Sequence, residues 1–349
     1  MERFVPERVF VQRGLEESQA ARRAFDAAPG APVETFDDLT GLPGRMEEVP
    51  AAEAKRRLVV ARRRGGFVKS FPSGRGISSP GWQYFIPAIG CPADCRYCFL
   101  QWYHPAGAPV VFAEREAMLA EIAETARRLG GGYFYGGELC DNLMLEEFCE
   151  VVSELARLFE TLPEATLELR TKSDRVAPLL EAQLPANVVV SWTFSPAGIV
   201  ERFEPGTATL EGRMEAARRL QRAGVRVGLR LDPLLLVEGW ERMYAGLVEQ
   251  LARRLDAQMV ESVHLGCFRF SPELKSAARR RFGAAAPFDA EFVRCRDGKY
   301  RYPRPLRLRA YRHLAALFRE WDAGMDVRLC METPRVERDL GEILSGAGG

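Results

Sequence analysis

From Tyr84 to Phe268 the sequence alternates between short apolar runs and longer amphipathic stretches. The apolar runs are rich in β-branched and aromatic residues, as strands are, and they cover 84–89, 132–135, 166–170, 188–193, 225–231 and 262–268. The stretches between them have helical periodicity and cover 113–129, 145–160, 175–183, 208–223 and 239–255. Strands joined by crossover helices lie parallel. We therefore expect an α/β sheet domain, either an open partial barrel or a doubly wound sheet, since six units are too few for a closed eight-stranded barrel.

The segments on either side of this alternation differ from it in composition. Residues 1–75 are predicted to form a partly helical N-terminal extension, with a loop up to Pro50 and a basic helix over 53–64. Residues 76–270 would form the sheet domain, and residues 271–349 a separate C-terminal region.

The C-terminal region contains a turn signal, Asp297-Gly298, between two short runs that suit strands, 293–296 and 299–302. A two-residue turn of this type closes a tight β-hairpin. A helix is predicted to follow over 306–320. We expect a β-hairpin and a helix appended to the sheet domain.

Composition limits the class of protein. Of the 349 residues, 47% are hydrophobic and 28% are charged, as in an ordinary globular protein. The sequence has no apolar run long enough to cross a membrane, and its start lacks the layout of a signal peptide, so we expect a cytoplasmic location. Eight cysteines in such a chain are not expected to form a disulfide framework. Three of them are clustered, which indicates one metal site.

The clustered cysteines, Cys91, Cys95 and Cys98, follow the first predicted strand directly. Three thiolates at this spacing can bind three irons of a [4Fe–4S] cluster, which is normally held by four thiolates. One iron would stay open to an exogenous ligand, which in enzymes with this spacing is S-adenosylmethionine (SAM). The alternative is a zinc site with a distant fourth ligand such as His104 or Cys140, although structural zinc usually uses paired C-x2-C units.

The second predicted strand ends in Tyr135-Gly136-Gly137-Glu138. Two glycines let the backbone approach a ligand closely, and a carboxylate can hydrogen-bond an ammonium group. This pattern matches the Gly-Gly-Glu element by which radical SAM enzymes hold the SAM amino group. Together with the cysteine loop it predicts an enzyme in which the cluster cleaves SAM to a 5′-deoxyadenosyl radical.

Several stretches outside these two elements carry a narrower resemblance. They are Phe71-Pro72-Ser73-Gly74, Cys98-Phe99-Leu100-Gln101, Arg170-Thr171-Lys172, Phe203-Glu204-Pro205-Gly206-Thr207, Glu238-Gly239-Trp240 and Gly298-Lys299-Tyr300-Arg301-Tyr302-Pro303. Through them the chain resembles the spore photoproduct lyase family of radical SAM enzymes, from about Gly65 to Arg335. The resemblance implies a partial (β/α)6 barrel and a carbon–carbon lyase that repairs DNA. In that reaction the adenosyl radical takes a hydrogen from a lesion that joins two thymines, the methylene bridge between them fragments, and a protein cysteine returns a hydrogen.

The resemblance also implies roles for individual residues. Cys140 is the candidate hydrogen donor, and Tyr97 matches a tyrosine that helps return the radical to SAM. The implied SAM contacts are Gly136, Gly137, Glu138, Lys172 and Ser191. Phe99 stands where the lyase has a second tyrosine, and the residues after Cys140 differ from the lyase's. A member of the same family that acts on RNA, a peptide or a small molecule therefore stays open as the alternative.

The predicted hairpin is basic, with eight Lys or Arg residues and one acid, Asp297, between Arg294 and Arg312. Its cations could neutralise DNA phosphates while an aromatic ring stacks at an opened base step. The alternative is an exposed hairpin that charge keeps soluble. We expect DNA as a partner, bound through Lys299, Tyr300, Arg301 and Tyr302. A small electron donor such as ferredoxin or flavodoxin would be a second partner, and the oligomeric state stays open.

Overall fold

A curved sheet forms the centre of the computed structural model, which describes residues 1–39, 49–71, 81–285 and 287–341. The strand order is β16-β12-β11-β10-β9-β8-β5-β4, and every neighbouring pair is parallel except β4 with β5. The strands are β4 (Val68–Ser70), β5 (Gln83–Phe85), β8 (Gly132–Tyr135), β9 (Ala165–Thr171), β10 (Val188–Thr193), β11 (Val227–Leu234), β12 (Val260–Cys267) and β16 (Val327–Leu329).

This sheet curls into an open barrel. Trp82, beside β5, lies 5.7 Å from His264 on β12, measured between ring centres, although the two strands are far apart in the strand order. The expected partial barrel is therefore confirmed, and a doubly wound sheet is excluded. Besides the six expected parallel strands, the sheet has β16 at one edge and the antiparallel β4 at the other.

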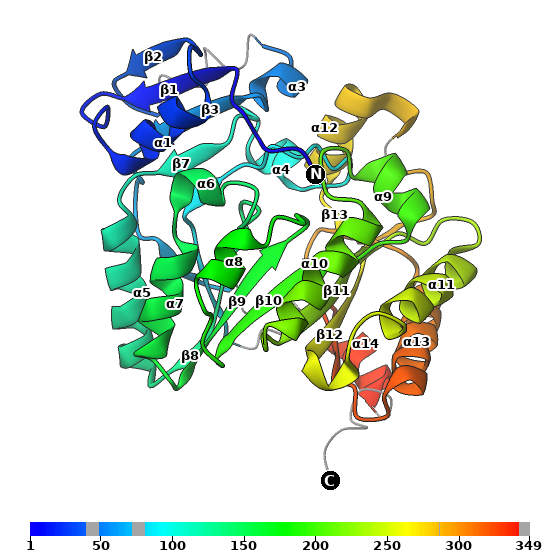
Figure 1. The fold of residues 1–349 in the computed structure, drawn as a ribbon. Helices are drawn as coiled ribbons and strands as arrows, with labels where there is room; N and C mark the ends of the chain where they lie inside the picture. The colour runs from blue at the N-terminus through cyan, green and yellow to red at the C-terminus, as the bar shows by residue number, and fades with distance from the viewer. Residues whose placement is uncertain (40–48, 72–80, 286, 342–349) are drawn as a thin grey trace.

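Helices cover the outer face of the sheet (Figure 1). They include α5 (Arg115–Leu129), α7 (Val152–Glu160), α8 (Ala177–Glu181), α10 (Leu210–Arg222) and α11 (Trp240–Ala252). Helix α10 begins where Thr209 accepts a hydrogen bond from Gly212 N–H, and it buries Leu210, Met214, Ala217 and Leu220 on one stripe. The expected helices and strands of this region are confirmed to within a few residues, with two exceptions. The run 84–89 is divided between β5 and β6 (Ala88–Ile89), and 145–160 between α6 (Glu146–Cys149) and α7.

The N-terminal region differs from the prediction, because it builds a sheet of its own. Its strands β1 (Arg8–Gln12), β2 (Val33–Phe36) and β3 (Arg57–Ala61) join β6 and β7 (Val110–Phe112) in the order β2-β1-β3-β7-β6, beside α1 (Gln19–Ala27). The expected helix over 53–64 is wrong: α3 (Ala51–Ala54) makes one turn and β3 follows. The apolar run of β3 pairs with β1 and β7, and this tertiary pairing overrides the local charge pattern. The predicted boundary at residue 75 lies outside the described residues.

The C-terminal region contains the expected hairpin and helix. Strands β13 (Arg269–Phe270), β14 (Val293–Arg294) and β15 (Tyr300–Arg301) form an antiparallel sheet, and α13 (Arg304–Trp321) follows. This region is not merely appended, because β16 returns to the barrel and pairs with β12. Among the described residues beyond the N-terminal region, four further α-helices were not predicted, namely α4 (Leu100–Tyr103), α9 (Ala197–Phe203), α12 (Pro272–Phe282) and α14 (Pro334–Asp339). Within the described ranges, no helix combines the length and the apolar character that a membrane span needs.

The barrel interior is held by a buried charge network. Glu168 on β9 is 1% exposed and accepts hydrogen bonds from Arg230 at 2.6 and 2.7 Å and from Arg170 at 2.9 Å. Burial alone would raise the pKa of Glu168, but Arg170 and Arg230 hold it well below its usual value. Both partners are needed because a buried carboxylate without them carries a large desolvation cost.

Replacing Arg230 with methionine is expected to lower the free energy of unfolding by about 3 kcal/mol, because it leaves Glu168 with one cationic partner. Urea denaturation followed by circular dichroism measures this loss. The matched control is Arg226→Met, at the residue before β11. This change breaks a more exposed ion pair, with Glu261, and should lower the free energy of unfolding by less than about 1 kcal/mol. Equal losses in the two variants would contradict the prediction.

Candidate functional site

The three clustered cysteines lie on the loop between β6 and α4. All three are free thiols, with Cys95 buried and Cys91 and Cys98 partly exposed. Burial raises the pKa of Cys95 to about 12, and the neighbouring Cys98 contributes to this shift. The Cys98 N–H donates to the Cys95 carbonyl at 3.1 Å. The loop thus presents three thiols within electrostatic reach of one another.

These thiols fit an iron–sulfur cluster better than a zinc ion. In the part of the chain that the structure describes, no three His, Cys, Asp or Glu side chains converge as a single ion requires. In a cubane cluster each thiolate binds a different iron, so the sulfurs need not converge on one point. Neither proposed fourth zinc ligand joins the loop: His104 Nε2 lies 2.7 Å from Ala108 O, and Cys140 is buried in a separate core.

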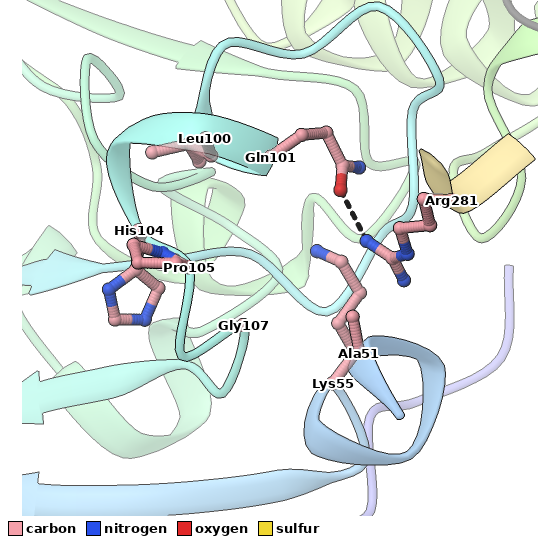
Figure 2. A pocket seen from close by; sticks show the side chains of 9 residues that line it. Ala51, Lys55, Leu100, Gln101, His104, Pro105, Gly107 and Arg281 are labelled. Atoms are coloured by element: carbon pink, nitrogen blue, oxygen red, sulfur yellow. Dashed lines mark hydrogen bonds between the residues drawn. The ribbon is translucent and has the colours of Figure 1, made fainter. Parts of the chain in front are cut away.

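Two side chains from distant segments, Lys55 and Arg281, hydrogen-bond the cysteine loop, and Figure 2 shows both beside Gln101. Lys55 Nζ donates to two carbonyl oxygens of the loop, at 2.7 and 2.8 Å. Arg281 of α12 donates to Asp94 at 2.8 Å and also to Gln101 of α4. Together they line a small pocket of about 40 Å³. Lys55 and Arg281 therefore hold the loop through its carbonyl oxygens and through Asp94. Neither cation hydrogen-bonds a cysteine thiol.

Tyr97 lies on the same loop, and its hydroxyl donates to Glu204. Glu204 also accepts hydrogen bonds from Arg213 at 2.5 Å and from Ser195 at 3.0 Å. Burial alone would raise the pKa of Glu204, but Arg213 and Lys172 lower it to about 2. Lys172 Nζ lies 5.1 Å from the centre of the Tyr97 ring. Tyr97 is thus hydrogen-bonded to a carboxylate that stays ionised at neutral pH.

The Gly-Gly-Glu segment follows β8 at the carboxyl end of the sheet. A Cβ on Gly136 would lie 2.4 Å from Asn142 Nδ2, and one on Gly137 would lie 2.9 Å from Arg170 Cβ. Gly137 also has a φ of 88°, which side chains disfavour. Glu138 lies 3.8 Å from Arg170 and is partly exposed. A side chain at either glycine would therefore clash with a neighbouring residue, and the Glu138 carboxylate remains partly accessible.

Two neighbouring strands place the other predicted SAM contacts at this end of the barrel. Asp141 accepts hydrogen bonds from Lys172 N–H and from the Thr171 hydroxyl, both at 2.7 Å, and so fixes the end of β9. On β10, Ser191 is 2% exposed. A Cβ on Gly228 of β11 would lie 2.1 Å from Ser191 Oγ, so this glycine makes room for the hydroxyl.

Lys172 links this strand end to the cysteine loop. Burial would lower the pKa of Lys172, but Glu204 raises it, and Cys95 and Cys98 act in the same direction. The structure thus brings Tyr97, Lys172 and the cysteines together. Sequence reasoning assigned no role to Glu204 or Arg213; Glu204 lies within the stretch 203–207 that carried the resemblance, and Arg213 had no local signal.

Cys140 lies apart from this group. Its thiol is buried in the core of the N-terminal sheet, with Ala88, Leu145 and Phe148 among its neighbours. Burial raises its pKa to about 12, and Cys149 is close enough for the two thiols to interact. These neighbours are core side chains, and the role of Cys140 as a hydrogen donor stays a prediction.

Two of the four predicted DNA contacts form hydrogen bonds within the protein. Arg301 is 1% exposed, and both of its terminal nitrogens bind Asp297 at 2.8 Å. Tyr302 is 2% exposed, and its hydroxyl accepts a hydrogen bond from Leu236 N–H at 3.1 Å. Arg301 therefore braces the hairpin turn, and Tyr302 ties the hairpin to the segment after β11; their role as substrate contacts stays a prediction.

The other two, Lys299 and Tyr300, remain partly exposed. Tyr300 stacks on Phe270 with ring centres 5.5 Å apart. Burial lowers the pKa of Lys299, Arg269 lowers it further, and Glu138 acts in the opposite direction. Lys299 is therefore within electrostatic reach of Glu138, so the hairpin extends to the mouth of the barrel.

Removing the Lys55 clamp should loosen the cysteine loop. In Lys55→Met two charge-assisted hydrogen bonds are lost, and we expect a reconstituted cluster to decay on the order of tenfold faster. Iron content and the visible absorbance of the anaerobic protein measure this decay. Arg56→Met is the control, because Arg56 makes an exposed pair with Glu7. Equal decay in both variants would contradict the role of Lys55.

Glu204 should make stability depend on pH. Its pKa is about 2 in the folded protein against a usual value of 4.5, so it stabilises the fold above pH 4.5 and loses this effect as the pH falls towards 2. Glu204→Gln should cost roughly 3 kcal/mol at pH 7. The difference from wild type should shrink below about pH 4.5, as urea denaturation between pH 7 and pH 3.5 can measure. A difference that stays constant over this range would refute the assignment.

Comparison with known proteins identifies the family. The family model described as spore photoproduct lyase matches residues 4–302. A spore photoproduct lyase of Geobacillus sp. (strain Y412MC61) is 25% identical over 270 residues, which are 73% of this chain and 76% of the relative. That of Bacillus subtilis (strain 168) is 24% identical over 269 residues, 74% of this chain and 75% of the relative.

Solved structures agree in fold. A spore photoproduct lyase complexed with dinucleoside spore photoproduct has a TM-score of 0.80 at 21% identity, covering 94% of this chain and 99% of that chain. A double mutant of the lyase with bound AdoMet and dinucleoside spore photoproduct has a TM-score of 0.79 with the same identity and coverage. The family match spans most of the sequence, and both the curled sheet and the cysteine loop agree with it. The chain belongs to the spore photoproduct lyase family.

Proposed function

We propose that this chain is a radical SAM lyase that reverses the spore photoproduct, a thymine dimer lesion, in DNA. One observation carries the proposal: three free thiols lie on one loop beside Lys172, at the end of the barrel that also bears the Gly-Gly-Glu segment. The family membership and the AdoMet and dinucleoside lesion in a solved relative support the same function.

The cofactor assignment follows from the donor groups. Cys91, Cys95 and Cys98 would hold three irons of a [4Fe–4S] cluster and leave the fourth open to SAM. When bound, this cluster supplies the electron that cleaves SAM to a 5′-deoxyadenosyl radical.

Charged and polar groups at the barrel mouth match the ammonium and carboxylate groups at the amino-acid end of SAM. Glu138 is a partly exposed carboxylate that can accept hydrogen bonds from the ammonium group, and the two glycines let that group approach the backbone. Lys172 keeps its proton beside Glu204 and can pair with the SAM carboxylate. Ser191 adds a hydroxyl from β10.

Tyr97 is proposed to take part in returning the radical. Its hydroxyl is buried and already donates to Glu204. If the phenol is oxidised, its proton has an acceptor in place at a Glu204 oxygen, so no rearrangement is needed. Phe99, the next residue but one, is 38% exposed and has no hydroxyl, so it cannot act in the same way.

For the partners, we propose DNA and a small electron donor such as ferredoxin or flavodoxin, in the cytoplasm. Of the four predicted DNA contacts, Lys299 and Tyr300 remain partly exposed. Arg294 and Arg296 are exposed on the same hairpin and can neutralise phosphates. These four side chains support a nucleic-acid substrate.

The test is a repair assay on dinucleoside spore photoproduct. Wild-type protein, reconstituted with iron and sulfide under anaerobic conditions, is given SAM and dithionite, and chromatography follows the repaired dinucleoside and 5′-deoxyadenosine. We expect both products from the wild-type protein. Cys95→Ala lacks one cluster ligand and should give neither product above background. Cleavage of SAM without repair of the lesion would contradict the proposal and favour a family member with another substrate, such as RNA, a peptide or a small molecule.

A further inference from the structure

A lysine from the N-terminal region lies buried against the cysteine loop. Lys55 ends the single turn of α3, two residues before β3 begins. It is 9% exposed, and its Nζ donates to the carbonyl oxygens of Cys91 at 2.8 Å and Ala93 at 2.7 Å. The ammonium group is thus hydrogen-bonded to the backbone of a residue whose thiol is a proposed cluster ligand.

The N-terminal sheet places both the lysine and the loop. Strand β3, which follows Lys55, pairs with β7, and β7 pairs with β6. Strand β6 leads directly into the cysteine loop. The turn of α3 also packs on the segment after α4, where a Cβ on Gly107 would lie 3.4 Å from Ala54 Cβ. The ammonium group is therefore held by strand pairing and packing, unlike a lysine on a free surface.

The charges at Lys55 do not cancel. Asp94 of the loop lies 4.0 Å from Lys55 Nζ, which is beyond hydrogen-bond distance, and it accepts a hydrogen bond from Arg281 at 2.8 Å. Burial lowers the pKa of His104, which lines the same pocket, so this ring is neutral at neutral pH. Two cations therefore share one carboxylate beside the cysteine loop (Figure 2).

Burying this ammonium group has a cost that its partners offset only in part. Carbonyl oxygens are neutral acceptors, whereas a buried charge is normally paired with an opposite charge. Three thiolates and the cluster that they bind would supply negative charge next to Lys55. The buried cation therefore matches a loop that holds an anionic group.

Reduction of such a cluster increases its negative charge. One electron converts [4Fe–4S]2+ to [4Fe–4S]+, while the thiolate ligands stay bound. A nearby cation stabilises the more negative state more strongly, and it does so most where burial keeps the effective dielectric constant low. Net charge is one of the factors that set the potentials of iron–sulfur clusters. A cation fixed beside the loop therefore favours the reduced form.

We propose that Lys55 raises the reduction potential of the cluster, so that the N-terminal sheet eases the electron transfer with which the reaction begins. This inference rests on the function proposed above, because it needs a cluster on Cys91, Cys95 and Cys98. The electron comes from the external reductant, and Lys55 neither gains nor loses a proton. Lys55 is a positioning residue, since it contacts the loop and acts on the cluster through its charge.

The experiment measures the potential of the cluster itself. Protein reconstituted with iron and sulfide is titrated anaerobically with dithionite in the presence of redox mediators, without SAM and at one fixed pH. Electron paramagnetic resonance gives the reduced fraction at each potential. In Lys55→Met the equilibrium constant for reduction should fall about tenfold, which is about 59 mV towards more negative potential for a one-electron couple.

Two further variants separate the charge of Lys55 from its hold on the loop. Lys55→Gln keeps N–H donors but has no charge, so its potential should also fall. Lys55→Arg keeps the charge and should have the wild-type potential. Arg56→Met is the matched control, because it removes a cation next in sequence whose side chain is exposed and paired with Glu7; its potential should equal that of wild type. Iron content and circular dichroism check each variant.

The outcomes distinguish this inference from the proposed function. Equal potentials in Lys55→Gln and Lys55→Arg would overturn the role of the charge, and this comparison decides even if Lys55→Met loses its cluster. A fall in Arg56→Met as large as that in Lys55→Gln would overturn it too. Wild-type protein that binds iron and sulfide but shows no [4Fe–4S]+ signal at any potential would instead overturn the proposed function, and the inference with it.

Discussion

The cysteine loop depends on one buried carboxylate, that of Glu204. The segment before and after Glu204 accepts backbone hydrogen bonds from the loop, at 2.9 Å from Arg96 N–H to Phe203 O and at 2.8 Å from Asp94 N–H to Pro205 O. Its side chain binds Tyr97 of the loop and Arg213 of α10. Arg213 in turn donates to the carbonyl of Thr193 at the end of β10. Loop, helix and strand are therefore joined through a single ionised group, whose charge is stable because cations surround it.

The barrel interior follows the same rule of paired charges. Glu168 is balanced by Arg170 and Arg230, and Asp232 by Arg269. Such pairs are costly to break because each partner would be left buried and unpaired. The barrel interior is therefore polar, and its buried carboxylates and guanidinium groups are paired with one another.

Local patterns predicted the parts of this site that are contiguous in the sequence. The spacing of Cys91, Cys95 and Cys98 and the segment 136–138 were found because each lies on one loop after one strand. Glu204 was missed as a partner of Tyr97, since its role depends on a hydrogen bond between residues more than a hundred positions apart. The strand β3 was missed because its residues follow a basic, helix-like run, and pairing with β1 and β7 decided its structure.

The sequence by itself determined the alternating α/β architecture and the three-thiol loop, because hydrophobic period and residue spacing are local properties of the chain. Only the tertiary structure decided where the remaining thiols lie. Cys140 follows the Gly-Gly-Glu segment, yet its side chain packs into the N-terminal sheet, whose strands β1 to β3 come from a region expected to be irregular. Cys330 lies at the barrel because β16 pairs with β12, more than sixty residues earlier. The side of a strand that a residue occupies depends on such long-range register, and no local pattern encodes it.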